Sequence, residues 1–115
     1  MDVPVEITFE GMGPSDAVRA RVEKEVEKLA QFQDRLTSCR VSVIAPSHHQ
    51  HKGGLFEVHI HATLPGNHDI VVDRHPAQDH AHEDVYIAIR DAFAAARRQL
   101  KDVSDKMKGK VKRHD

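Results

Sequence analysis

The chain has 115 residues and a mass of 12.9 kDa, which suits one compact domain and excludes two of ordinary size. No apolar run approaches the roughly 20 residues that a membrane-spanning helix needs. A single cysteine excludes both an internal disulfide and a multi-cysteine zinc module. The formal net charge of −1 gives no sign of a polyanionic partner. These features together predict a cytoplasmic protein without a membrane partner.

The first two elements predicted along the chain are a strand and a helix. Apolar and polar residues alternate over 3–9, the pattern of a strand with one buried face. After a glycine-rich break, Ser15 is a suitable N-cap, because its hydroxyl can accept a hydrogen bond from an unpaired amide of the first turn. Helical spacing to about residue 31 then produces an apolar stripe of Val18, Val22, Val26 and Leu29. A neighbouring face of this helix carries the basic residues Arg21, Lys24 and Lys28.

Three further strands are predicted over 39–45, 56–64 and 69–74, each with alternating apolar and polar residues. The polar segment between the first two predicts a hairpin loop, and a proline–glycine–asparagine sequence predicts a tight turn before the third. Cys39 alternates with valines, so we expect it to be a small core residue.

The last predicted element is a long amphipathic helix that begins near residue 85. Its apolar side chains form one continuous stripe of Val85, Ile89, Phe93, Ala96, Leu100, Val103 and Met107. A second, basic stripe consists of Arg90, Arg97, Lys101, Lys108 and Lys112. At roughly 100° per residue the basic stripe lies beside the apolar one, so we expect it near the groove between this helix and its neighbour. Gly109 marks the expected end of order, which predicts a single domain over 1–108 and a flexible basic tail over 109–115.

The order of these elements predicts an α+β fold, β-α-β-β-β-α, with a four-stranded sheet and two helices packed on one face. Consecutive strands joined by short turns should be antiparallel. The first strand must reach the same sheet through the first helix, as in a right-handed crossover.

The average charge conceals a polarity along the chain. Residues 1–85 hold eight Lys and Arg against fourteen Asp and Glu, a formal charge of −6. Residues 86–115 hold nine against four, a formal charge of +5. Such an asymmetry indicates a polyanion-binding end better than the net charge does. A solvated helix with a frayed tail is the plain alternative.

Several segments occur together in the order and spacing of a known family. They are the segment 14–19, the end of the first helix with Asp34-Arg35-Leu36, the segment 84–90, and the basic segment 97–101. In this respect the chain resembles the ribosome hibernation-promoting factors, also called ribosome-associated translation inhibitor A or sigma-54 modulation proteins. The resemblance covers nearly the whole chain and implies a fold similar to double-stranded-RNA-binding domains. It also implies binding to the small ribosomal subunit and its rRNA, in the channel used by mRNA and tRNA, and inhibition of translation under stress or in stationary phase.

The charge pattern and the resemblance together predict an RNA-binding surface shared by both helices. Phosphate and ribose contacts suit clustered cations, whereas few aromatic residues are available to stack single-stranded bases. Tyr86 also fits a packing role, because it lies beside Val85 and Ile89. The predicted surface consists of Arg21, Lys24, Lys28, Tyr86, Arg90, Arg97, Arg98, Lys101 and Lys108. A stand-alone module for double-stranded RNA is the alternative function.

Ten histidines are the unusual feature of the composition. His59 and His61 point to the same side of a predicted strand, whereas His80 and His82 accompany acidic residues in the segment 74–84. These four are the candidate metal ligands, and a metal-binding protein is a lesser alternative. Their spacing matches no zinc signature, so we expect no cofactor and interpret them as polar cover for an exposed sheet face.

Catalysis has little support in the sequence. Ser38 and Ser42 lack a recognisable histidine–acid partner motif, and no glycine-rich loop could hold a phosphate. We therefore expect neither an enzyme nor a small-molecule substrate. Self-association through an open sheet edge is left undecided by the sequence.

Overall fold

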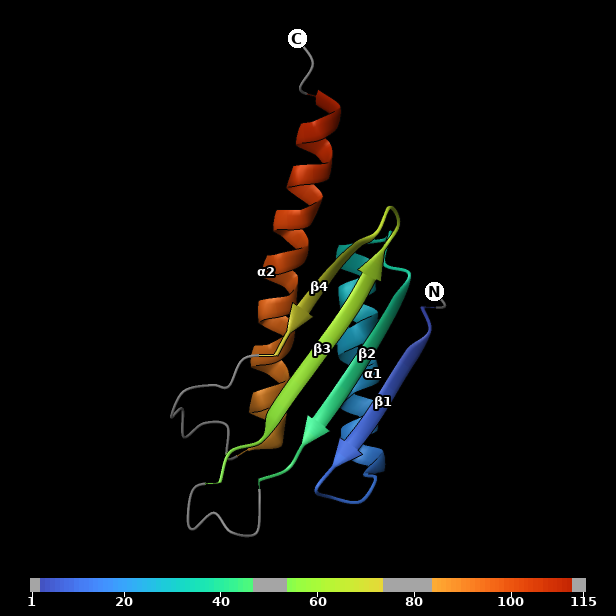
Figure 1. The fold of residues 1–115 in the computed structure, drawn as a ribbon. Helices are drawn as coiled ribbons and strands as arrows, with labels where there is room; N and C mark the ends of the chain where they lie inside the picture. The colour runs from blue at the N-terminus through green and yellow to red at the C-terminus, as the bar shows by residue number, and fades with distance from the viewer. Residues whose placement is uncertain (1–2, 47–53, 74–83, 113–115) are drawn as a thin grey trace.

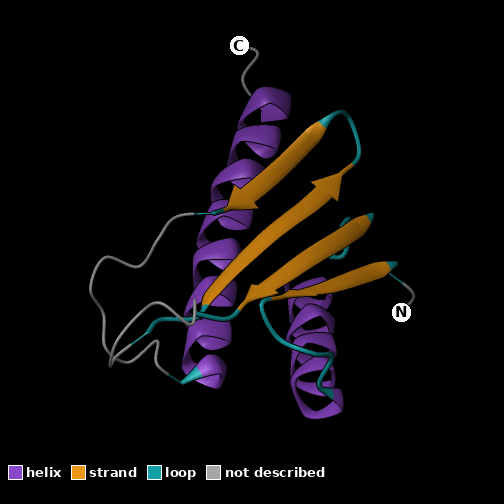
Figure 2. Ribbon diagram, turned by 60° about the horizontal axis from the view of Figure 1, so that its bottom comes forward, coloured by secondary structure: helices purple, strands orange, loops and turns teal. Residues whose placement is uncertain are grey.

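The computed structural model describes residues 3–46, 54–73 and 84–112, with backbone only for 108–112. It shows a four-stranded sheet with two helices packed on one face (Figure 1; Figure 2). The strands lie in the order β1-β2-β3-β4, with β1 parallel to β2 and the other neighbours antiparallel. The predicted α+β fold and its element order are confirmed: β1 (Val5–Glu10), α1 (Asp16–Phe32), β2 (Ser38–Ile44), β3 (Glu57–Leu64), β4 (His68–Val72) and α2 (Val85–Lys112).

Local chemistry sets the boundaries of these elements. The Ser15 hydroxyl accepts a hydrogen bond from the Val18 backbone N–H at 3.2 Å, which confirms the predicted N-cap of α1. Gly66 and Asn67 have φ angles of 79° and 62° in the β3–β4 turn. Glycine and asparagine adopt this left-handed conformation at the lowest cost, so they allow β4 to fold back on β3.

The hydrophobic core lies between the sheet and the helices. Strands β2 to β4 bury alternate side chains there, and the helices bury their apolar stripes; the largest fully buried side chains include Phe93, Leu29, Ile60, Ile89, Leu100, Val22 and Val41. Cys39 is a core residue, as expected, and burial raises the pKa of its thiol to about 11. The helices cover β1, at one edge of the sheet, less completely than the other strands. Val5 of this strand keeps 36% of its surface exposed.

The two helices differ in length. Helix α2 continues through Gly109 to Lys112, four residues beyond its expected end at Lys108. One glycine costs a helix only about 1 kcal/mol relative to alanine, and the surrounding lysines are good helix formers. The last turns of α2 therefore extend past the β3–β4 turn (Figure 1). Among the described residues, neither helix is long and apolar enough to cross a membrane.

Candidate nucleic-acid interface

The charged residues of α1 are divided between two sides of the helix. Glu23 and Glu27 line a small hollow with Val5 beside β1. Arg19 also lies on that side, with its guanidinium carbon 5.6 Å from the centre of the Phe9 ring. At roughly 100° per residue, the predicted RNA-binding residues of α1 share the other side, which faces away from β1: Arg21, Lys24 and Lys28.

The basic side of α1 meets α2 at Arg21. The Arg21 guanidinium carbon lies 5.9 Å from the centre of the Tyr86 ring, in the first turn of α2. Its Nε donates to Glu25 Oε2 at 3.0 Å, and the Glu25 side chain is only 9% exposed. Tyr86 is 37% exposed, so it is both a packing residue and a surface residue. Of these three, Glu25 was absent from the sequence prediction, although its i,i+4 spacing from Arg21 was a usable signal.

The contact with Arg21 shows which side of α2 borders α1. Helical periodicity places Arg90, Arg97 and Lys101 within about 60° of Tyr86 around the helix axis. All three are exposed. They therefore follow the same edge of α2, and the backbone of Lys108 continues that row. We call the five described cations that flank this line of contact the basic seam: Lys24 and Lys28 of α1, and Arg90, Arg97 and Lys101 of α2.

The cations of the basic seam are only weakly neutralised. Arg90 Nη2 lies 3.1 Å from Asp91 Oδ1, and Lys101 Nζ lies 3.0 Å from Asp105 Oδ2. The Asp105 carboxylate raises the pKa of Lys101 above its usual value. Exposed pairs of this kind are screened and readily exchanged, so they do not prevent contact with another anion. Within the described residues, Lys24, Lys28 and Arg97 have no ion-pair partner.

Arg98 stands apart from the other predicted cations. It is exposed, but it follows Arg97 by about 100° around α2 and so faces away from α1. The structure thus brings most of the predicted surface to the seam, separates Arg98 from it, and pairs Arg21 with Glu25 and Tyr86 of the protein itself. The side chain of Lys108 lies outside the described residues.

The two candidate metal ligands within the described residues, His59 and His61, lie on the opposite side of the sheet from the helices. His59 Nε2 lies 3.1 Å from Glu57 Oε1, and His61 Nε2 lies 2.8 Å from Asp69 Oδ2. In the described ranges, no three His, Cys, Asp or Glu side chains are arranged to hold a metal ion. His80 and His82 lie outside the described residues, so their assignment stays a prediction.

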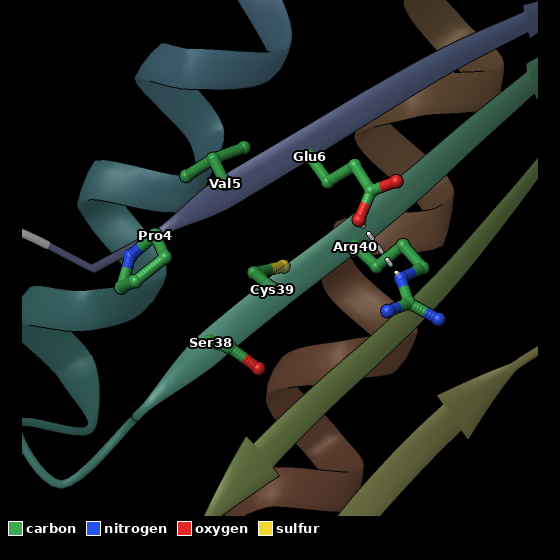
Figure 3. A pocket seen from close by; sticks show the side chains of 6 residues that line it. All are labelled: Pro4, Val5, Glu6, Ser38, Cys39 and Arg40. Atoms are coloured by element: carbon green, nitrogen blue, oxygen red, sulfur yellow. Dashed lines mark ion pairs between the residues drawn. The ribbon is translucent and has the colours of Figure 1, made fainter.

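Two hollows lined by described residues are small. One lies between the beginnings of β1 and β2 and has a volume of about 130 Å³; an ion pair at 3.3 Å joins Glu6 and Arg40, two of the residues that line it (Figure 3). The hollow beside Glu23 and Glu27 has a volume of about 140 Å³. Pockets for small organic ligands usually measure about 300–1,000 Å³. The basic seam is therefore the stronger candidate site, and it suits an extended anion.

Comparison with known proteins adds independent information. The family model described as sigma 54 modulation protein / S30EA ribosomal protein matches residues 5–108. A ribosomal subunit interface protein from Coxiella burnetii is similar with a TM-score of 0.70 and 17% sequence identity, over 90% of this chain and 99% of that one. The N-terminal domain of Protein Y from Thermus thermophilus is similar with a TM-score of 0.61 and 24% identity, over the same shares, 90% and 99%. At these identities the two structures establish a shared fold. A search of curated proteins found no match.

Proposed function

The chain belongs to the sigma 54 modulation protein / S30EA ribosomal protein family, and from that premise we propose that it binds the small ribosomal subunit and inhibits translation. The family consists of ribosome-associated proteins of the hibernation type and not of enzymes. The proposed ligand is rRNA in the channel used by mRNA and tRNA, and the proposed setting is the cytoplasm under stress or in stationary phase. No small-molecule substrate or cofactor is part of the proposal.

The observation that carries the proposal is the basic seam. Two rows of cations, one from each helix, follow the helix edges that meet where Arg21 contacts Tyr86. Lys24, Lys28 and Arg97 have no ion-pair partner among the described residues. Structured RNA is recognised mainly through its shape and through phosphate and ribose contacts, and that chemistry needs clustered cations without a stacking platform. The protein described as a ribosomal subunit interface protein shares this fold. The description of that protein as a ribosomal subunit interface protein supports association with the ribosome for this chain as well.

Co-sedimentation with purified small subunits on a sucrose gradient tests the proposal. If the five cations of the seam each meet a phosphate, a plot of log affinity against log salt should have a slope of about −4.5. Failure to migrate with small subunits at low salt would refute the proposed function.

A competition experiment separates the proposed function from the alternative of a stand-alone module for double-stranded RNA. A 20-base-pair RNA duplex is added to the bound complex in increasing amounts. Release only at a large excess of duplex supports ribosome binding. Release at equimolar duplex supports the alternative.

A further inference from the structure

Arg21 differs from the other cations that the sequence assigned to the RNA-binding surface. Its side chain is 33% exposed, whereas those of Arg90 and Lys101 are 62% and 68% exposed. Arg21 makes two contacts with other side chains of the protein: its Nε donates to Glu25, and its guanidinium lies against the Tyr86 ring. Arg21 is therefore half-buried, and its guanidinium is engaged by two groups of the protein itself.

Glu25 explains why Arg21 is held in this position. Its carboxylate is nine-tenths buried on the core side of α1, next to Val22 and Val26, and its partner among the described residues is Arg21. A buried carboxylate without a hydrogen-bonded counter-charge is strongly unfavourable. If Arg21 swung outward to a phosphate, it would leave this carboxylate buried and unpaired. The exposed Lys24 has no such constraint.

The contact between Arg21 and Tyr86 joins the two helices. The Tyr86 backbone N–H donates to Asp84 Oδ1 at 2.8 Å, so Tyr86 belongs to the capped first turn of α2. Arg21 belongs to the second turn of α1. The guanidinium on the ring thus joins the beginning of α2 to α1 at the start of the seam. Because a helix is stiff, the direction of its first turn also directs Arg90 and Arg97 further along.

We propose that Arg21 is a positioning residue: held by Glu25 and packed on Tyr86, it fixes the first turn of α2 against α1 and so sets the spacing between the two rows of the basic seam. It does not itself neutralise a phosphate. This inference rests on the proposed function for its binding readout, and on the free protein for its structural readout.

The substitution Glu25→Met distinguishes the two roles by the sign of its effect on binding to small subunits. Methionine preserves helix propensity and tolerates burial, so the fold should survive. If Arg21 contacted phosphate, removal of its internal anion would release it and tighten binding. If Arg21 is a positioning residue, its release weakens binding, and we expect a loss of about 3- to 10-fold. Glu27→Met is the matched control for the lost negative charge, because Glu27 lies on the β1 side of α1.

A second test compares Arg21→Met with Lys24→Met through the salt dependence of binding. Each direct phosphate contact contributes about 0.9 to the slope of log affinity against log salt. We expect Lys24→Met to reduce the slope by about that amount and Arg21→Met to weaken binding with the slope unchanged. A reduced slope for Arg21→Met, or tighter binding by Glu25→Met beyond that of Glu27→Met, would overturn the inference.

The free protein provides a readout that does not depend on ribosomes. Tyr86 is the only tyrosine, and the chain has no tryptophan, so the tyrosine fluorescence reports this one ring. Arg21→Met and Glu25→Met should change it, whereas Lys24→Met should not. The conservative Arg21→Lys should also change it, because a lysine ammonium lacks the planar group that stacks on the ring. If the wild-type protein fails to bind small subunits while these spectral changes occur, the proposed function is wrong and the positioning role stands; unchanged fluorescence refutes the positioning role.

Discussion

The two faces of the molecule differ in how their charged side chains are paired. On the open face of the sheet, Arg40, His59 and His61 each lie within 3.3 Å of a carboxylate oxygen from Glu6, Glu57 or Asp69. On the helix face, cations from two helices gather along one seam, and carboxylates accompany only some of them. Cations of the first face are paired with carboxylates of the same face, whereas the second face keeps cations without an ion-pair partner among the described residues.

The difference arises from the geometry of strands and helices. Alternate residues of neighbouring strands stand side by side on one face of a sheet, so opposite charges pair in place: Glu6 opposes Arg40, and Thr8 opposes Ser42 with a 2.9 Å hydrogen bond between their hydroxyls. Two packed helices instead bring together whichever edges flank their apolar stripes. Here both edges are basic. A formal net charge of −1 is therefore compatible with an anion-binding surface, because the acidic residues lie elsewhere.

The largest expected effect is the loss of binding when the far part of the helix face is reversed in charge. Arg97→Glu, Arg98→Glu and Lys101→Glu together should weaken binding to small subunits by about 100-fold or more, because two cations of the seam and one neighbouring cation become repulsive to phosphate. Gradient co-sedimentation measures the loss, and circular dichroism checks that the fold survives.

Two single charge reversals on α2 refine the comparison. Arg97→Glu should weaken binding to small subunits, whereas Lys106→Glu, about 180° away from Arg97 around the helix, should have little effect on binding. Equal losses for both would mean that the position of the charge on α2 is unimportant.

The next largest expected effect is a fall in the stability of the protein at high pH, caused by the buried Cys39 of β2. The pKa of the buried Cys39 thiol is raised from 9.0 to about 11. Its folded-state pKa is thus above the unfolded value, so its contribution to stability is complete below pH 9 and is lost as the pH rises from 9 toward 11. The full rise in pKa corresponds to about 3 kcal/mol of folding free energy. Urea unfolding at pH 8 and pH 10.5 should show a decline in the wild type that is smaller in Cys39→Ala; the same decline in both would assign it to other groups.

The smallest effect is expected on the open face. His61→Ala removes the partner of Asp69, but this exposed pair should change the free energy of unfolding by less than about 1 kcal/mol. Binding to small subunits should change by less than twofold, because this face is on the far side of the sheet from the seam. A loss of binding comparable to that of Arg97→Glu would break the distinction between the two faces.

Much of the fold could be predicted from the sequence because each element repeats its own pattern. The alternation in β2 and β3, the Ser15 cap and the apolar stripe of α2 are local signals, and the structure confirms them. The end of α2 could not be located from Gly109, since one glycine does not stop a helix. The partial exposure of Val5 could not be predicted either, because the alternation of apolar and polar residues shows which side chains share a face but not what covers that face.

The candidate site was likewise only partly predictable from the sequence. Its cations could be found from charge and helical spacing within a single element, and so could the expectation that the basic stripe of α2 lies beside its apolar stripe. The pairing of the two rows depended on which edge of α2 meets α1, and that is visible only in the contact between Arg21 and Tyr86. The same contact, together with the buried Glu25, separates Arg21 from the cations it resembles in sequence.

The sequence by itself determined which residues share a face, because the periods of 3.6 and 2 residues follow from backbone geometry alone. It also determined the charge polarity along the chain and the order of the elements. Only the tertiary structure decided which faces meet. Burial of two apolar stripes against one sheet brought the basic edges together, and a buried carboxylate, which needs a counter-charge, holds the half-buried Arg21.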